Sequence, residues 1–128
     1  MVLLPKYRKD IFADELHKGY VRELLAEIAR EYEAEIEAME VADDHVHLLV
    51  DIPPKMSVAD FARIIKSISA REMFKQFPGL KKRLWSGKLW RPGYIVRSVG
   101  SGVTKENIKR YIEEHRNKEG SPAQLELD

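Results

Sequence analysis

Two histidines separated by one valine, in the run Asp44-His45-Val46-His47, are the side chains of this sequence best suited to chemistry. Successive side chains along a β-strand point to opposite faces, so His45 and His47 would share one face while Val46 points to the other. Two imidazoles side by side on a rigid strand begin a divalent metal site, whose third ligand must come from elsewhere. The alternative is a strand edge with solvated or hydrogen-bonded histidines, because a His-x-His pattern is short and occurs by chance.

A second pair of reactive side chains stands near the end of the chain, where Tyr111 and His115 would share one face of a helix. A tyrosine hydroxyl can act as a nucleophile that forms a covalent intermediate. Because its ordinary pKa is about 10, it needs help, which a divalent ion gives by polarising a phosphate and neutralising its charge. His115 would then bring the third ligand to the histidine pair. The alternative is an amphipathic helix whose tyrosine covers the core.

The patterning before and around the histidines predicts the elements that position them. Apolar residues at three- and four-residue steps predict a helix over residues 13–32, with Leu16 among its buried residues. Alternating residues then predict a strand at 33–41, a tight turn at 42–44 and a strand at 45–52, paired as a hairpin.

Further elements are predicted on both sides of this hairpin. The short apolar start at residues 2–4, stopped by a proline, predicts only the stub of a first strand. Ser57 suits the N-cap of a helix over 58–76, which Pro78-Gly79 ends. A strand is predicted over 94–99 and, after the hinge Gly100-Ser101-Gly102, a last helix over 104–117.

This order of elements predicts an α+β fold. It is that of a ferredoxin-like or RNA-recognition-like antiparallel sheet with helices packed on one face, and the C-terminal helix carries the tyrosine. We expect one domain over residues 1–118 and a flexible tail over 119–128.

Composition and charge narrow the class of function. Residues 1–54 hold 6 Lys and Arg against 13 Asp and Glu, whereas residues 55–118 hold 16 against 5. The basic half suggests a polyanionic partner, most simply nucleic acid; the alternative is a solvated basic face that pairs with the acidic half. The chain has no cysteine, which excludes disulfides and thiolate metal sites. No apolar run is long enough to span a membrane, and the expected compartment is the cytoplasm.

Together these features resemble the single-tyrosine HUH transposases of small insertion sequences, named for their histidine-hydrophobe-histidine motif. The histidine pair alone is a weak signal, whereas the set in this order is specific. The matching motifs cover about residues 5–116 and are Lys6-Tyr7-Arg8, Met39-Glu40-Val41, Asp44-His45-Val46-His47-Leu48-Leu49, Lys66-Ser67-Ile68-Ser69-Ala70-Arg71, Lys88-Leu89-Trp90, Tyr94 and Ile108-Lys109-Arg110-Tyr111-Ile112-Glu113.

The resemblance implies a reaction and a set of metal ligands. Tyr111 would attack a phosphodiester of single-stranded DNA, leaving a 5′-phosphotyrosine bond and a free 3′-OH. His45 and His47 would hold Mg²⁺ or Mn²⁺ on the phosphate, with His115 completing the site. The family typically has glutamine at that last position, and the softer imidazole would favour Mn²⁺. A second departure is Asp43, which stands where the family has proline and would add negative charge near the metal.

The resemblance also implies partners. The family works as a homodimer that recognises DNA hairpins at the ends of its element, and the hinge at 100–102 is compatible with a tyrosine helix that acts in trans. Trp85 and Trp90 could stack on bases, although a place in the core is the expected one. The DNA contacts expected in the basic half are Lys66, Arg71, Lys81, Lys82 and Arg83.

Two other functions remain open from the sequence. One is a non-catalytic RNA- or DNA-binding module, against which stands the absence of aromatic stacking residues on the central strands. The other is a domesticated, catalytically idle transposase relative that only binds repeat hairpins.

Overall fold

The computed structural model describes residues 1–5, 11–83, 88–98 and 109–113. Residues 109–113 are helical. The tail at 119–128 and the hinge at 100–102 lie outside the described residues. Along the chain the labelled elements are β1 (Val2–Leu3), the 3-10 helix η1 (Ile11–Ala13), α1 (Glu15–Glu31), β2 (Glu35–Val41), β3 (Val46–Asp51), α2 (Val58–Gln76) and α3 (Pro78–Arg83).

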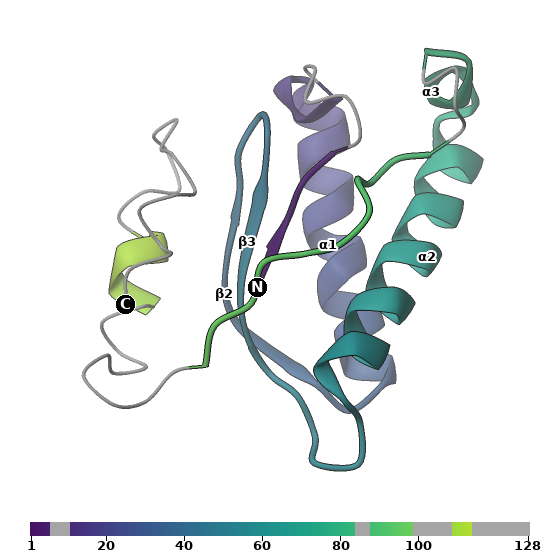
Figure 1. Ribbon diagram of the computed structural model, residues 1–128. Helices are drawn as coiled ribbons and strands as arrows, with labels where there is room; N and C mark the ends of the chain where they lie inside the picture. The colour runs from purple at the N-terminus through teal and green to yellow at the C-terminus, as the bar shows by residue number, and fades with distance from the viewer. Residues whose placement is uncertain (6–10, 84–87, 99–108, 114–128) are drawn as a thin grey trace.

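The sheet is antiparallel, with its strands in the order β1, β3, β2 (Figure 1). The chain returns to the other edge of β1, where bridges pair Val2 with Ile95 and Pro5 with Trp90. Val2 and Ile95 exchange backbone hydrogen bonds of 2.7 and 3.1 Å. The resulting order, 90–95, β1, β3, β2, is that of a βαββαβ ferredoxin-like sheet, and the predicted α+β fold is confirmed.

The strand predicted over 94–99 is wrong in its extent. Within the described residues, pairing in this segment is limited to the bridges at Trp90 and Ile95, and residues 96–98 join no ladder. The cause is the length of its partner, because β1 has only two residues to pair with. Gly93, with φ of 80°, also turns the chain between the two bridges.

Helix α1 begins at its cap and buries a different face from the one predicted. The Asp14 side chain accepts a hydrogen bond of 2.8 Å from Leu16 N, so the helix starts at Glu15. Leu16, predicted to be buried, is 73% exposed because it lies on the solvent side of this first turn. His17 is buried in its place and donates from Nδ1 to the carbonyl of Ile11 at 2.8 Å.

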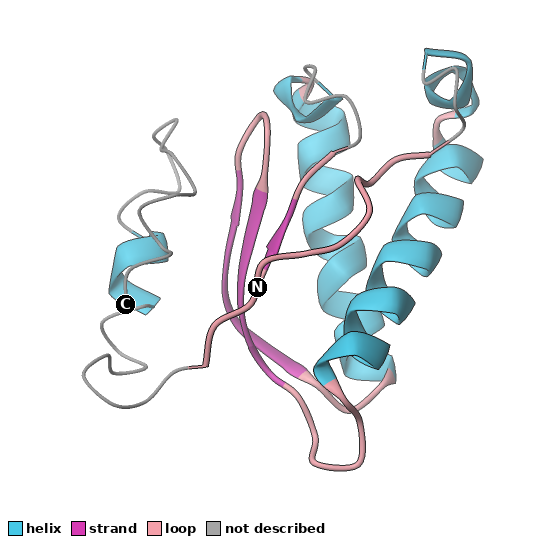
Figure 2. Cartoon of the chain, in the orientation of Figure 1, coloured by secondary structure: helices cyan, strands magenta, loops and turns pink. Residues whose placement is uncertain are grey.

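Helix α2 follows the prediction closely. The hydroxyl of Ser57 accepts from Asp60 N at 3.0 Å, and the helix runs from Val58 to Gln76. Both α1 and α2 cover one face of the sheet, whereas residues 109–113 lie at the opposite face (Figures 1 and 2). None of the helices in the described part of the chain is long and apolar enough to cross a membrane.

Trp90 belongs to the core, as the sequence suggested. Its side chain is 5% exposed, packs beside Phe12, and donates from Nε1 to the hydroxyl of Ser69 at 2.9 Å. This bond ties the segment at 90–95 to α2. Trp85, which was considered with it, lies outside the described residues.

Replacing Ser69 by alanine is expected to lower the free energy of unfolding by about 1–3 kcal/mol, because the buried Trp90 Nε1–H loses its acceptor. Chemical denaturation followed by tryptophan fluorescence measures this loss. Ser67→Ala is the matched control, since Ser67 lies on the same helix and is exposed. Equal stability of the two variants would contradict a stabilising role for the hydrogen bond between Trp90 and Ser69.

Candidate active site

The β2–β3 hairpin presents carboxylate and imidazole donors on the sheet face away from α1 and α2. Antiparallel register pairs Glu40 with His47 and Val41 with Val46. The two valines join the main core, so Glu40 and His47 face the other way. His45 lies in the turn before β3, where its carbonyl accepts a backbone hydrogen bond of 2.9 Å. The turn therefore covers 42–45 and the predicted strand start was one residue early.

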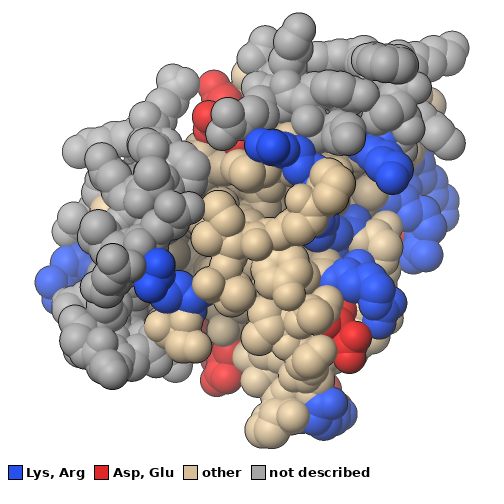
Figure 3. All heavy atoms as spheres, viewed as in Figure 1, with Lys and Arg blue, Asp and Glu red and all other residues tan. Residues whose placement is uncertain are grey.

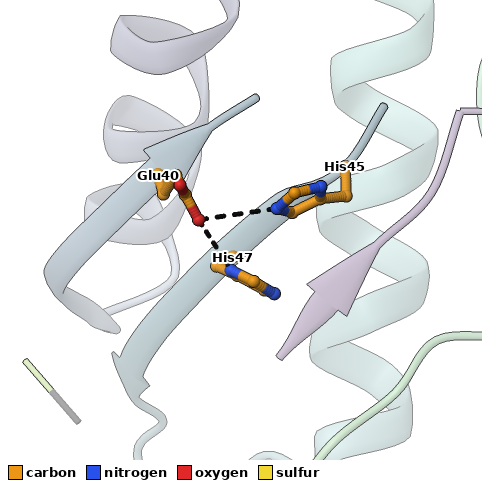
Figure 4. Close-up of side chains that lie close together, drawn as sticks. All are labelled: Glu40, His45 and His47. Atoms are coloured by element: carbon orange, nitrogen blue, oxygen red, sulfur yellow. Dashed lines mark hydrogen bonds and ion pairs between the residues drawn. The ribbon is translucent and has the colours of Figure 1, made fainter. Parts of the chain in front are cut away.

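Figure 4 shows the Glu40 carboxylate facing both rings of the histidine pair. Its Oε1 accepts from His47 Nδ1 at 2.8 Å and lies 3.5 Å from His45 Nε2. The other nitrogen of His45, Nδ1, lies 2.8 Å from Asp44 Oδ1. The ring centroids of the histidines are 4.4 Å apart. Glu40, His45 and His47 are each at most 2% exposed, so this is a buried polar cluster.

The donor atoms of this cluster fit a divalent ion. Glu40 Oε2, His45 Nε2 and His47 Nε2 are buried and have no hydrogen-bond partner among the described residues. One donor from each residue can be chosen so that all three lie within 4.8 Å of one another. Two ligands held about 2.1 Å from one ion lie about 3.0–3.5 Å apart, which matches the 3.5 Å between His45 Nε2 and Glu40 Oε1.

The electrostatics favour an ionised carboxylate between the rings. Burial alone would raise the pKa of Glu40, but the facing ring of His45 and the hydrogen bond from His47 outweigh it and bring the pKa to about 2. Burial lowers the pKa of His47 despite its bond to Glu40, which favours a neutral ring. Burial would lower the pKa of His45 too, yet the carboxylates of Glu40 and Asp44 raise it, which favours a charged ring. The cluster thus combines one negative carboxylate with two imidazoles, and a cation that displaces the second proton of His45 would find the donor set of a metal site.

Tyr111 lies on the same face of the sheet. Its neighbour Ile112 is 1% exposed and packs against Ala38 and Leu49, and Tyr111 packs partly buried against this group. Ala38 and Leu49 are paired across the hairpin, two residues from Glu40 and His47 along each strand and so on the same face. Burial raises the pKa of the Tyr111 phenol, and the negative charge of Glu40 raises it further. The helix at 109–113 thus brings the phenol within electrostatic range of Glu40 inside one chain.

The basic residues singled out in the sequence fall into two groups. Lys66 and Arg71 lie on α2. Lys66 Nζ donates to the carbonyls of Arg91 and Gly93 at 2.7 Å each, and burial lowers its pKa. Arg71 Nε lies 3.4 Å from the carboxylate of Glu72. The remaining predicted contacts, Lys81, Lys82 and Arg83, belong to α3, and their side chains lie outside what the structure describes, as does His115.

A groove of about 540 Å³ lies between α2 and the segment at 88–94. Arg63, Lys66 and Lys88 line it, none of its described lining residues is acidic, and most of the others, including Leu89 and Trp90, are apolar. Figure 3 shows Lys and Arg side chains gathered on the α2 side of the molecule, with few acidic atoms among them. The groove is therefore suited to an anionic ligand with apolar parts.

Glu40 is the site residue that sequence reasoning missed. Its strand was predicted, but Glu40 received no chemical role of its own. Strand alternation and the hairpin register would have placed it opposite His47, had the turn been taken as 42–45 instead of 42–44. The charge predicted for Asp43 near the metal is instead engaged with α1, where its Oδ1 lies 3.3 Å from Lys18 Nζ.

Comparison with known proteins shows the family. Residues 1–115 match the profile of the family described as IS200-like transposase. The chain is 40% identical over 114 residues to the ISDra2 transposase TnpA of Deinococcus radiodurans, covering 89% of this chain and 80% of that protein. It is 34% identical over 118 residues to the transposase for insertion sequence element IS200 of Salmonella typhimurium, covering 91% and 77%.

Solved structures agree. One from Deinococcus radiodurans, 40% identical, superposes with a TM-score of 0.70 and covers 88% of this chain and 85% of that one. The structure of a REP-associated tyrosine transposase bound to a REP hairpin, 17% identical with a TM-score of 0.54, covers 88% and 59% and shows likeness of fold alone. The chain belongs to the IS200-like transposases, a family of DNA-processing enzymes.

Proposed function

We propose that this transposase cleaves and rejoins single-stranded DNA through Tyr111, using Mg²⁺ or Mn²⁺ held by His45 and His47. Glu40 supplies a further ligand from the same hairpin, and His115 joins from the C-terminal helix. The observation that carries this proposal is the packing of helix 109–113 on the sheet face that presents the buried Glu40, His45 and His47 cluster. A phenol nucleophile and a cation site on one face are what phosphoryl transfer through a covalent intermediate requires.

The proposed cleavage and rejoining of DNA need no added energy source. The Tyr111 oxygen forms a bond to phosphorus, the bond from phosphorus to the 3′ oxygen breaks, and the 3′ oxygen takes a proton while the phenol proton passes to water. The product is a 5′-phosphotyrosine ester and a free 3′-OH. A 3′-OH attacking this ester reverses the step, so the energy of the broken phosphodiester is kept.

The chain's own residues prepare this step. Two imidazoles and one carboxylate would hold the ion, which when bound would polarise the scissile phosphate and offset its negative charge. A phenol is protonated at neutral pH, and burial and the charge of Glu40 raise the pKa of Tyr111 further, so positive charge entering the site would make it a better nucleophile. Deprotonation of Tyr111 would therefore be easier in a site that holds the ion.

We further propose a hairpin-bearing DNA strand as substrate and a homodimer as the working form. The fold neighbour bound to a REP hairpin supports a hairpin as the probe. Helix 109–113 packs on the sheet of its own chain, which supports action of Tyr111 within one protomer. Exchange of the helix through the hinge at 100–102, with action in trans, is the alternative.

The test of the proposed function is a covalent adduct. The protein is incubated with a labelled hairpin-containing DNA strand and Mn²⁺, and the products are separated under denaturing conditions. A labelled band at the mass of protein plus DNA is expected with the metal and none after chelation. Binding of the hairpin without any adduct, across both metals, would favour the idle hairpin-binding relative instead.

Removing the groove cations is expected to weaken DNA binding. The double variant of Arg63→Ala and Lys88→Ala should reduce affinity for the hairpin strand by about 3- to 30-fold and flatten its salt dependence, because each cation neutralises a phosphate. Fluorescence anisotropy at several salt concentrations measures both effects. Lys75→Ala is the control, since Lys75 is exposed on the same helix but does not line the groove. An equal loss in Lys75→Ala would place the DNA elsewhere on α2.

A further inference from the structure

Asp44 contacts the buried cluster of Glu40, His45 and His47, but the function proposed above gives it no role. It lies in the turn before β3, and its side chain is 51% exposed while that of His45 is fully buried. Its Oδ1 is 2.8 Å from His45 Nδ1. The opposite nitrogen of the same ring, Nε2, lies 3.5 Å from Glu40 Oε1 and makes no hydrogen bond among the described residues. His45 is therefore held at one nitrogen and open at the other.

This arrangement determines which nitrogen carries the proton. An ionised carboxylate only accepts hydrogen bonds, so the contact with Asp44 requires a proton on His45 Nδ1. In the neutral ring the lone pair then sits on Nε2 and faces the oxygen of Glu40. Two electron-rich atoms facing each other at 3.5 Å repel, so the contact is favourable only with a second proton on His45 or a metal ion between them.

We propose that Asp44 is a positioning residue for the ion site, which fixes His45 as the Nδ1–H tautomer and aims its Nε2 lone pair at the ion. The inference rests on the metal site of the proposed function. Carboxylates that hold the second nitrogen of a metal-binding histidine fix its tautomer and ring orientation, and their loss typically lowers metal affinity about 10- to 100-fold. Glu40 Oε1 makes the equivalent contact with Nδ1 of His47.

The neighbouring residue provides a matched control. Asp43 has the same side chain and charge and a similar exposed fraction, 40% against 51%. Its Oδ1 lies 3.3 Å from Lys18 Nζ, and among the described residues it makes no hydrogen bond or ion pair with a histidine. A change at Asp43 removes the same negative charge from the same turn, so any difference between the two positions reports the hydrogen bond to His45 and not the net charge.

The experiment compares Asp44→Ala, Asp44→Asn and Asp43→Asn with the unmodified full-length chain. Calorimetric titration with MnCl₂ alone gives the metal affinity. Long-range ¹⁵N–¹H spectra of the metal-free proteins, recorded about two pH units above the ordinary imidazole pKa, give the tautomer of each histidine. His45→Gln and His47→Gln assign the signals.

We expect Asp44→Ala to reduce Mn²⁺ affinity about 10- to 100-fold and to turn His45 into a mixture of tautomers while His47 is unchanged. Asp44→Asn, which keeps an acceptor oxygen, should fall between this variant and the parent. Asp43→Asn should change affinity less than about twofold. A purely structural role for Asp44 would move the melting temperature without moving the His45 tautomer.

Three results would overturn the proposal. The first is an Asp44→Ala variant with the parent's affinity and His45 tautomer, and the second is an equal loss of affinity in Asp43→Asn. The third is a parent chain that binds no Mn²⁺, which removes the ion site itself and with it the proposed function. In that last case the tautomer spectra still show whether Asp44 fixes His45, so the two failures are distinguishable.

Discussion

Replacing Tyr111 by phenylalanine is expected to abolish the covalent protein–DNA adduct, a loss of at least about 10³-fold in cleavage. The phenol hydroxyl is the only group removed, and it is the nucleophile of the proposed reaction. The ring stays, so its packing beside Ile112 against Ala38 and Leu49 is retained. The adduct assay with hairpin DNA and Mn²⁺ measures the effect.

Controls must show that Tyr111→Phe loses only the reactive hydroxyl and keeps its fold and its DNA binding. Its melting temperature and its affinity for the hairpin strand should match those of the parent chain. Tyr20→Phe is the control, because Tyr20 lies on α1, packs against Phe77 and does not line the groove. An adduct that persists in Tyr111→Phe but disappears in another tyrosine variant would move the nucleophile to that residue.

The hairpin and the two long helices could be predicted from the sequence because their signals are local. Ser57 and Asp14 cap the helices with their own side chains, and the alternation on each side of the turn needs only strand geometry. The end of the sheet could not be predicted in the same way. Whether residues 94–99 form a strand depends on how many residues β1 offers as partners, and that is a property of a distant segment.

The candidate site likewise has residues that the local sequence predicts and residues that only the pairing of distant segments brings in. His45 and His47 are adjacent in sequence, so their spacing alone predicted a metal site. Glu40 joins them only through the hairpin register, which a one-residue error in the turn changes from one face to the other. Asp43 and Asp44 are identical in the sequence, and only the fold shows that one meets Lys18 while the other meets His45.

The second large effect is expected at the ion itself, where His47→Asn should lower Mn²⁺ affinity more than about 100-fold and remove the adduct. His47 is buried, its Nε2 is unpaired among the described residues, and burial favours its neutral form. The amide of asparagine lies where Nδ1 of the ring lies, so it can still donate a hydrogen bond to Glu40 and keep that carboxylate partnered. Alanine at the same position would strand a buried charge at a cost of about 3–5 kcal/mol, so a loss there could reflect unfolding.

His115→Ala is expected to behave differently, with Mn²⁺ affinity lowered about tenfold or less and binding still saturable. The reason is that Glu40, His45 and His47 all come from one hairpin, so three donors remain when the C-terminal helix offers none. Calorimetric titration of the two variants side by side, with melting temperatures as the check on folding, gives the comparison. A His115→Ala variant that loses Mn²⁺ as completely as His47→Asn would place the third ligand on the tyrosine helix and reduce Glu40 to a hydrogen-bond partner of His47. Ion binding would then require the docked helix, and the ion and the nucleophile would arrive at the DNA together.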